Sequence, residues 1–196
     1  MGMKQEFQPL TQKDKVTVLL YRTGIVLSAV FMSSLAYVLA MGAFPVSISP
    51  DYLAYGLYAS VGISVFFIHL YIGKFKTFLK NLYYISLGCL AVLIVIAKGP
   101  LSGAFTEQPY RLLLLLPLSG CLGFVTAKEA FCFQLFEGYL LAMIMPFYLL
   151  LVSSGALAGR GASYGLVLIA ALLVIFTLRK VFMPLAYDIG DKSAYQ

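Results

Sequence analysis

Long stretches without a charged side chain alternate with short charged or Gly/Pro-rich segments along the 196-residue chain. A helix needs roughly 17–25 mainly apolar residues to cross the hydrocarbon core of a bilayer. A membrane-spanning strand would instead alternate apolar and polar residues, and these stretches are continuously apolar. The pattern therefore predicts an all-α fold, a polytopic transmembrane helical bundle of about six helices. The expected spans are residues 16–43, 52–72, 81–97, 111–127, 135–153 and 164–182.

The composition supports this class and excludes others. Hydrophobic residues make up 61% of the chain and charged residues 11%, and the mean hydropathy is +0.92. Since a soluble domain has roughly 45–50% apolar and about 25% charged residues, a soluble globular protein is excluded. The 3 cysteines lie in apolar sequence, which argues against a disulfide framework. No linker separates a second folding unit, so residues 1–196 are expected to form a single membrane domain.

The basic residues predict how the chain sits in the membrane. The net charge is +6, and in a membrane protein such charge reports orientation rather than nucleic-acid binding. With six spans, Lys98, Arg111 and Arg160 fall on one side, and the remaining 11 of the 14 basic residues fall on the side of the termini. We therefore predict that both termini are cytoplasmic. The expected partner is the lipid bilayer, without nucleic acid, and a protein partner or a homo-oligomer is left open.

Familiar catalytic and cofactor motifs are missing from the sequence. The chain has 1 histidine, His69, which rules out a bis-His haem or a His-rich zinc site within one chain. Neither an HExxH metalloprotease motif nor a GxxxxGK[ST] phosphate loop occurs. Between the first and the last expected span, Glu129 and Glu137 are the only acids close together, and eight positions separate them. We therefore expect no enzyme activity, no catalytic residue, no metal and no cofactor.

The segment from Lys128 to Gly138, between two expected spans, is unusual because it combines aromatic and oppositely charged residues. One interpretation is a tight turn whose phenylalanines lie among lipid headgroups; the other is a cytoplasm-facing pocket or partner contact. A re-entrant, an interfacial and a continuous helical segment are all compatible with the sequence. An ionisable residue at the edge of a span usually has a partner, so we expect Glu129 to pair with Arg22 or Lys128. The candidate cytoplasmic polar cluster comprises Arg22, His69, Lys128, Glu129, Cys132 and Glu137.

Small residues mark a candidate packing surface on the second expected helix. Gly56, Ser60 and Ser64 recur every four residues, and such a stripe allows another helix to approach closely. Pro117 and Pro146 fall inside the fourth and fifth expected spans and should kink them.

The run from Gly123 to Phe133, with Glu137 after it and Tyr21-Arg22-Thr23-Gly24 in the first span, resembles a known family. The family consists of uncharacterised bacterial integral membrane proteins of unknown function, known mainly from cyanobacteria and proteobacteria, and its distinctive motif is Lys-Glu-Ala-Phe-Cys-Phe. The resemblance implies a multi-pass protein of the inner (plasma) membrane with six or seven helices. It marks Lys128, Glu129, Cys132 and Glu137 as typical of the family. It implies no activity and no ligand.

Two functions fit the sequence. The first is a non-catalytic membrane subunit, assembly factor or scaffold, because the centres of the expected spans lack charged residues and the polar residues gather at one face. The second is a small-solute or ion transporter or channel, formed in an oligomer, because of the two prolines and the scattered Ser, Thr and Tyr residues. The state of the interior distinguishes them: a transporter for polar solutes needs a polar, water-accessible cavity.

Overall fold

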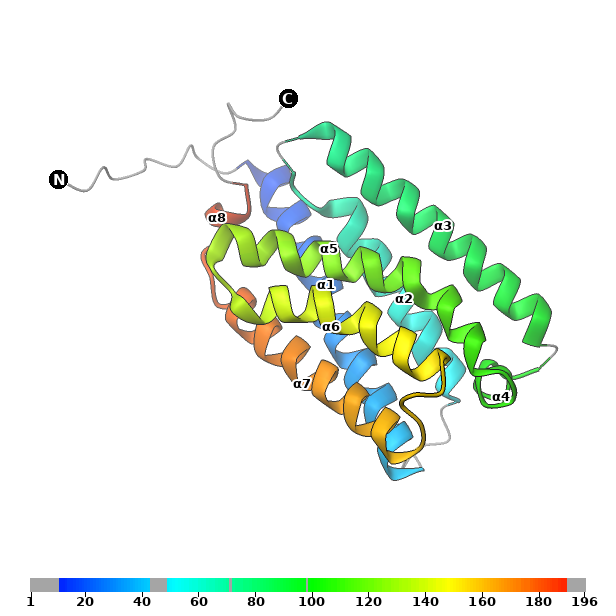
Figure 1. Cartoon of the computed structure of the whole chain (residues 1–196). Coiled ribbons are helices and arrows are strands. Elements are labelled where there is room, and N and C mark those ends of the chain that lie inside the picture. Colours follow the sequence, from blue (N-terminus) through cyan, green and yellow to red (C-terminus); the bar gives the residue numbers. More distant parts are fainter. Residues whose placement is uncertain (1–10, 43–48, 71, 98, 190–196) are drawn as a thin grey trace.

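The computed structural model describes residues 11–42, 49–70, 72–97 and 99–189, and all of the regular structure in these ranges is helical. Helices α1, α2, α5, α6 and α7 form a bundle, and α3 lies along its outside (Figure 1). The helices are α1 (Gln12–Met41), α2 (Pro50–Phe67), α3 (Gly73–Ala97), α4 (Leu101–Glu107), the 3-10 helix η1 (Pro109–Leu115), α5 (Leu116–Phe133), α6 (Phe136–Ser153), α7 (Arg160–Val181) and α8 (Ala186–Ile189).

Local sequence signals fix the first helix boundaries. Thr11 caps α1 through a reciprocal pair of hydrogen bonds with Asp14, 2.9 Å and 3.2 Å long. The helix ends at Gly42, whose φ of 70° lies in the left-handed region that glycine adopts without strain. Ser49 caps α2, and Pro50 occupies its first turn, where the missing N–H is not needed.

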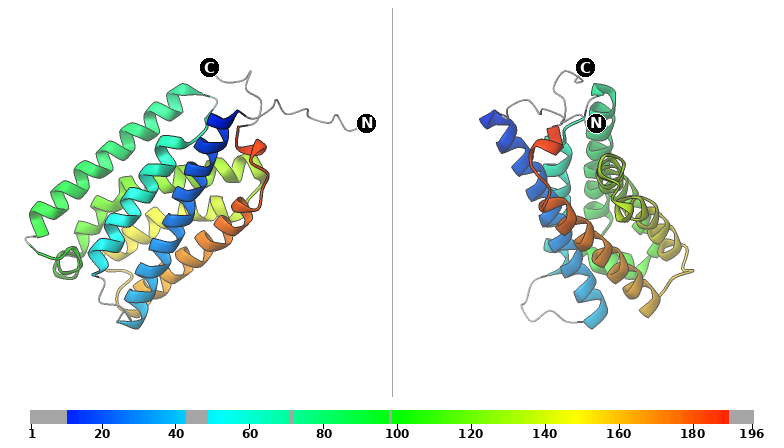
Figure 2. Two further views of the ribbon diagram at one scale, coloured as in Figure 1. Left: turned by 180° about the vertical axis from the view of Figure 1, so that it is seen from behind. Right: turned by 90° about the vertical axis from the view of Figure 1, so that its left-hand side faces the viewer.

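Helices that follow one another in the chain pack together, as α1 and α2 do, and so do some that are far apart in the chain, such as α1 and α7. α1 lies between α2 and α7, and α5 packs against α6 on one side and α3 on the other (Figure 2). The first turns of α1 and the short helix α8 lie at the same end of the bundle. Helix α4 and the 3-10 helix η1 lie at the opposite end, between α3 and the start of α5.

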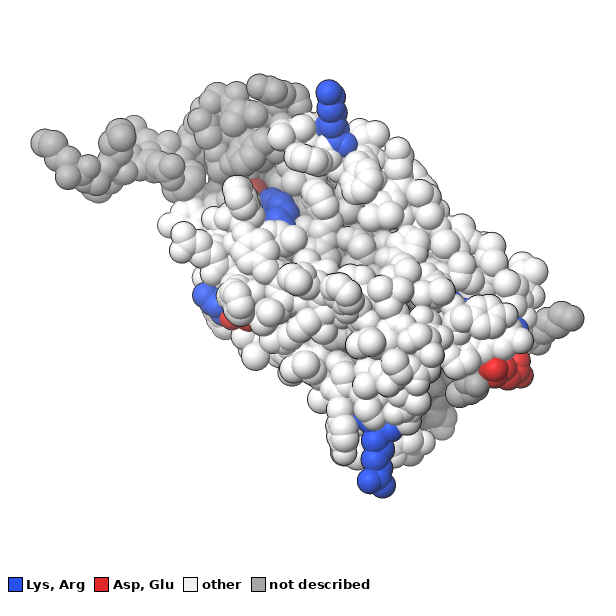
Figure 3. All heavy atoms as spheres, in the orientation of Figure 1, with Lys and Arg blue, Asp and Glu red and all other residues white. Residues whose placement is uncertain are grey.

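Five helical segments in the described part of the chain are long and apolar enough to cross a membrane. They are Gln12–Met41, Gly73–Ala97, Pro109–Phe133, Phe136–Ser153 and Arg160–Val181. On the face shown in Figure 3, a broad uncharged band separates charged atoms at the two ends of the molecule. This distribution is the one expected of a bundle that spans a bilayer.

Of the six spans predicted from the sequence, five correspond to helical segments that are long and apolar enough to cross a membrane. The exception is α2, which the sequence pattern placed at residues 52–72. It ends at Phe67, and its 18 residues include Asp51 and the hydroxyl groups of Ser60 and Ser64, which lower its hydropathy. It is nevertheless a full member of the bundle because it packs along α1. Parts of the α1–α2 connection, including position 43 of the first predicted span, lie outside the described residues.

Other predicted boundaries also shift. Helix α3 begins at Gly73 rather than at residue 81, because its first two turns carry Lys74, Lys76 and Lys80, which are good helix formers that can extend beyond the hydrocarbon. Helix α5 continues to Phe133 rather than stopping at residue 127. The last span, predicted at 164–182, is α7 and starts at Arg160.

The small-residue stripe of α2 faces α1. Ser60 Oγ lies 2.9 Å from Ser28 Oγ, and Ser64 Oγ lies 3.5 Å from the backbone oxygen of Tyr21. A Cβ atom at Gly24 would lie 2.7 Å from the backbone nitrogen of Ser64 and 2.8 Å from the backbone oxygen of Ser60. The two backbones therefore approach too closely for any side chain larger than glycine at this position.

Candidate functional site

The α5–α6 turn is much shorter than the charged and aromatic segment of the sequence suggests. Lys128 and Glu129 belong to the last turns of α5, and only Gln134 and Leu135 connect it to α6. Gln134 has a φ of 54°, a left-handed conformation that reverses the chain at once. Of the three arrangements open from the sequence, the structure has a continuous helix up to Phe133 followed by a tight turn.

Glu129 is completely buried and has three polar partners. Tyr21 Oη of α1 donates a hydrogen bond of 2.7 Å to Glu129 Oε1, and Lys128 Nζ lies 2.7 Å from the same oxygen. The other carboxylate oxygen, Oε2, pairs with Lys180 Nζ of α7. A buried carboxylate is stable only when such partners replace its water, and here they join α5 to α1 and α7.

Asp188 of α8 extends these contacts to the C-terminal segment. One carboxylate oxygen pairs with Lys180 Nζ, and the other accepts a 2.7 Å hydrogen bond from Arg22 Nε and lies 2.5 Å from Arg22 Nη2. The guanidinium of Arg22 also donates to the backbone oxygens of Val181, Met183 and Pro184 at 2.6–3.1 Å. One arginine of α1 therefore fixes the chain as it leaves α7 and enters α8.

We refer to Arg22, Lys128, Glu129, Lys180 and Asp188 as the ion cluster. The side chains of Glu129, Lys180, Asp188 and Arg22 are between 0% and 7% exposed. Charges alternate along the chain of contacts, so each cation faces at least one carboxylate. Opposite charges attract more strongly in a low-dielectric interior than in water, and the same environment makes an unpaired charge very costly.

Aromatic rings complete the surroundings of the ion cluster. Lys180 Nζ lies 4.0 Å from the centroid of the Phe133 ring, within the range of a cation–π contact. The Phe133 ring in turn stacks on Tyr187 of α8, with centroids 6.3 Å apart. Phe133 is thus half-buried against the protein core, whereas Phe131 and Phe136 are 80% and 68% exposed.

The structure brings only some of the predicted cluster residues together. Arg22, Lys128 and Glu129 come together: Glu129 pairs directly with Lys128, but Arg22 reaches it only through Asp188 and Lys180. Glu137 forms a separate pair with Arg179, 2.5 Å long, near the surface. Cys132 is exposed.

His69 lies just after α2 and contacts α1. Its Nε2 is 3.2 Å from Thr17 Oγ1, and its Nδ1 is buried without a hydrogen-bond partner among the described residues. Burial lowers the pKa of His69, and the positive charges of Lys128 and Lys76 lower it further, against the opposing influence of Asp188 and Asp14. The imidazole is therefore neutral at pH 7 and stays outside the ion cluster.

Three members of the site were not predicted: Tyr21, Lys180 and Asp188. Lys180 was counted only as one of the basic residues on the side of the termini, but it is fully buried. The available signal was its position in the last turn of that span, with an acid eight residues later beyond Pro184. The Tyr21 hydroxyl gave no signal, because a tyrosine near a span end normally lies at the membrane interface.

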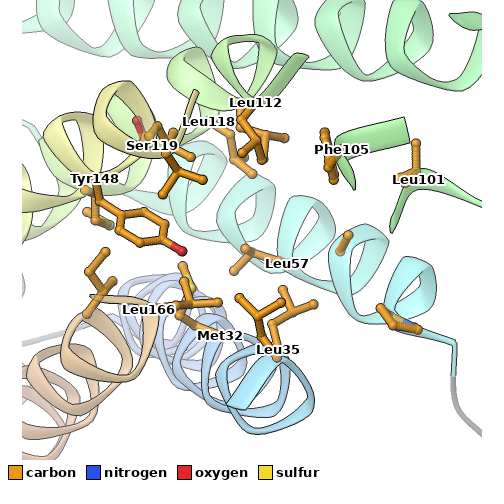
Figure 4. Close-up of a pocket in the computed structure, with 18 of the residues that line it drawn as sticks. Met32, Leu35, Leu57, Leu101, Phe105, Leu112, Leu118, Ser119, Tyr148 and Leu166 are labelled. Atoms are coloured by element: carbon orange, nitrogen blue, oxygen red, sulfur yellow. The ribbon is translucent and has the colours of Figure 1, made fainter. Parts of the chain in front are cut away.

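A second feature lies at the opposite end of the bundle. A cavity of about 520 Å³ is lined by residues of α1, α2, α3, α4, η1, α5, α6 and α7. Figure 4 shows Met32, Leu57 and Leu166 converging on it from three of these helices. The ion cluster uses the beginning of α1, whereas the cavity reaches Gly42 at its end. The cavity and the ion cluster are therefore separate sites.

These features define a multi-pass integral membrane protein with an all-helical bundle. No three His, Cys, Asp or Glu side chains among the described residues lie close enough together to hold a metal ion. Residues 63–196 match the family described as uncharacterized integral membrane protein (DUF2301), so the chain belongs to that family. No curated protein and no solved structure matches the chain.

Proposed function

We propose that the protein is a non-catalytic subunit, assembly factor or scaffold of the bacterial inner (plasma) membrane. The supporting observation is that the charged groups of the ion cluster bind one another. Glu129 pairs with Lys128 and Lys180, and Asp188 pairs with Lys180 and Arg22. A general acid, a general base or an ion-coupling carboxylate needs a group that can exchange a proton or a ligand.

The cavity supports the same proposal. A route for a polar solute needs polar groups along its walls, but this cavity is lined mainly by Leu, Met, Val and Phe side chains (Figure 4). In the sequence, no charged residue occurs between Arg22 and Asp51 or between Lys80 and Lys98. Both features favour a packed, non-conducting bundle over the alternative of a small-solute or ion transporter or channel.

The end of the bundle that carries the ion cluster is the surface we assign to a partner. Three phenylalanines are strongly exposed there: Phe131, Phe136 and Phe182, at 80%, 68% and 85%. Aromatic side chains are enriched where proteins contact one another and at membrane interfaces. The 11-to-3 distribution of basic residues supports a cytoplasmic location for this end.

Reconstitution into liposomes tests the proposal. We expect proteoliposomes to leak protons and potassium ions no faster than empty liposomes, as measured with a trapped pH indicator and a trapped potassium-sensitive dye. A protein-dependent flux that Glu129→Gln abolishes would overturn the non-conducting assignment. Reporters fused after Gln196 test the orientation. A reporter that works only in the cytoplasm should be active. Activity of a reporter that works only in the periplasm would put the ion cluster on the periplasmic side and contradict the proposed orientation.

The partner surface requires its own experiment. Cys132 is exposed at the same end as Phe131, whereas Cys121 is buried and Cys89 is half-buried. In a Cys89→Ser background, a photo-crosslinker attached to Cys132 therefore reports on this surface. In native membranes we expect one protein band to crosslink reproducibly and to weaken when Phe131→Ser is introduced. Tyr164→Ser, which removes an aromatic side chain 68% exposed at the other end, is the control. Crosslinking to lipid alone would assign the phenylalanines to the membrane interface.

A further inference from the structure

We infer that the cavity at the end opposite the ion cluster binds one hydrocarbon chain of a membrane lipid. Its volume of about 520 Å³ lies within the range of roughly 300–1,000 Å³ typical of ligand sites. The inference does not depend on the proposed function, since a scaffold and a transporter could both hold such a lipid.

The polar groups in the wall identify the chemistry of the occupant. Tyr148 Oη donates a 2.9 Å hydrogen bond to the backbone oxygen of Ala162, and Ser119 Oγ donates one of 2.9 Å to the backbone oxygen of Leu116. Asp51 accepts a 3.2 Å hydrogen bond from the backbone N–H of Leu101. These three groups are engaged within the protein, whereas the hydroxyl of Tyr58, which also lines the cavity, is buried without a hydrogen-bond partner among the described residues. A polar ligand would therefore lose its water and find one free hydroxyl in exchange.

An apolar occupant is favoured over a polar one or over water in this cavity. Water is poorly held in an apolar cavity because it finds too few hydrogen-bond partners. An empty cavity also loses dispersion contacts with the side chains around it, such as Leu57 and Met32. A hydrocarbon chain restores these contacts and takes no polar group of the wall away from a partner that it already has.

The position of the cavity favours a chain that remains attached to a lipid headgroup. It is lined by Gly42 at the end of α1, Pro50 at the start of α2 and Ala162 in the first turn of α7. These residues lie where the spans meet the membrane surface, so a headgroup can stay at the interface while its chain enters between the helices. The surrounding bilayer supplies such chains at high concentration.

Tryptophan fluorescence provides a direct test because the natural chain contains 0 Trp. Phe105→Trp places a single reporter in the cavity wall, and Phe147→Trp places one on the outer face of α6, where the native side chain is 59% exposed. The probe is phosphatidylglycerol with brominated acyl chains, added in increasing mole fraction to the protein in detergent micelles. We expect saturable quenching of the reporter at position 105 and quenching roughly proportional to mole fraction at position 147.

Two alanines of α2 provide a matched pair of further variants. Ala54 lines the cavity, whereas Ala59 is exposed and does not line it. In the Phe105→Trp background, Ala54→Phe should weaken the saturable binding by about tenfold or more, and Ala59→Phe should leave it unchanged. If Ala54→Phe fails to fold, as judged by circular dichroism, Ser119→Leu narrows the cavity from α5 and should have the same effect.

Three results would contradict the inference that the cavity binds a lipid chain. Quenching proportional to mole fraction at both reporter positions would show that the cavity holds no lipid chain. Saturable quenching that neither Ala54→Phe nor Ser119→Leu weakens would place the lipid elsewhere. A brominated alkane without a headgroup should bind more weakly than the lipid. Equal binding of the two would contradict the assignment to a lipid and would identify the occupant as a free apolar molecule.

Discussion

Glu129 connects three helices at the end of the bundle that carries the ion cluster. Its carboxylate contacts Tyr21 of α1, Lys128 of its own helix and Lys180 of α7, and none of its surface is exposed. Removing one member of a buried ion pair is more damaging than replacing both, because the remaining charge stays buried without a partner. The two glutamates of this region should therefore differ strongly in their importance.

Glu129→Gln should lower the free energy of unfolding by about 3–5 kcal/mol, because Lys180 loses one of its carboxylate partners and Lys128 loses its only carboxylate partner among the described residues. Glu137→Gln is the control: its partner Arg179 is 49% exposed, so about 0–1 kcal/mol is expected. Thermal unfolding in detergent, followed by far-UV circular dichroism, measures both. Equal effects of the two substitutions would show that burial of Glu129 is not decisive.

His69 should make stability depend on pH in a defined direction. Because burial lowers its pKa in the folded protein, the unfolded chain binds a proton more readily, and protonation favours unfolding. The stability it contributes is present above the unfolded pKa of about 6.5 and is lost as the pH falls below it.

The matching experiment compares wild type with His69→Gln. The wild-type unfolding temperature should fall between about pH 7.5 and about pH 5.5, and the variant should lose part of this slope. Gln keeps a hydrogen-bonding group near Thr17 but cannot take up a proton in this range. Identical slopes for the two proteins would mean that His69 is not the titrating group.

At the scale of the helices, the contact between α1 and α2 depends on the absence of a side chain at Gly24. A Cβ atom there would lie against backbone atoms of Ser60 and Ser64, which cannot move aside without separating the helices. At Gly88 of α3, a Cβ atom would meet nothing within 4 Å. The two glycines therefore form a natural pair for one substitution.

Gly24→Ala should destabilise the protein by about 1–3 kcal/mol through overpacking. Gly88→Ala should be neutral or stabilising by up to about 1 kcal/mol, because alanine is the better helix former. Unfolding in detergent at increasing denaturant concentration separates the two cases. A neutral Gly24→Ala would imply that α1 and α2 are further apart than the structure shows.

The helices also show how far the sequence predicts the structure. The lengths of the apolar stretches and the charged or Gly/Pro residues between them predict the ends of α1, α6 and α7 to within about four residues. They do so because the thickness of the hydrocarbon core directly constrains such segments. The same argument fails at α2, whose hydroxyl groups bind α1 rather than lipid. The argument from apolar length also predicts too early an end for α5, because it treats a charged residue as the point where the chain leaves the membrane. Lys128 and Glu129 instead find partners inside the bundle.

The whole molecule combines a charged end, a packed middle and an apolar cavity. Sequence reasoning identified Arg22, Lys128 and Glu129, because a charge near the edge of a span requires a partner. It could not identify Asp188, since only the fold brings α8 back to the beginning of α1. The cavity was likewise invisible, because a leucine that lines a cavity and a leucine that faces lipid are identical in sequence.

The central claim is that the ion cluster is a structural connection between helices rather than a set of reactive groups. A double-mutant cycle between Glu129 of α5 and Lys180 of α7 tests it most directly, using Glu129→Gln, Lys180→Met and the combined variant. Each single substitution should destabilise the protein, and the combined loss should be smaller than the sum of the two by about 1–3 kcal/mol. Additive losses would show that the two residues do not stabilise each other and would contradict the claim.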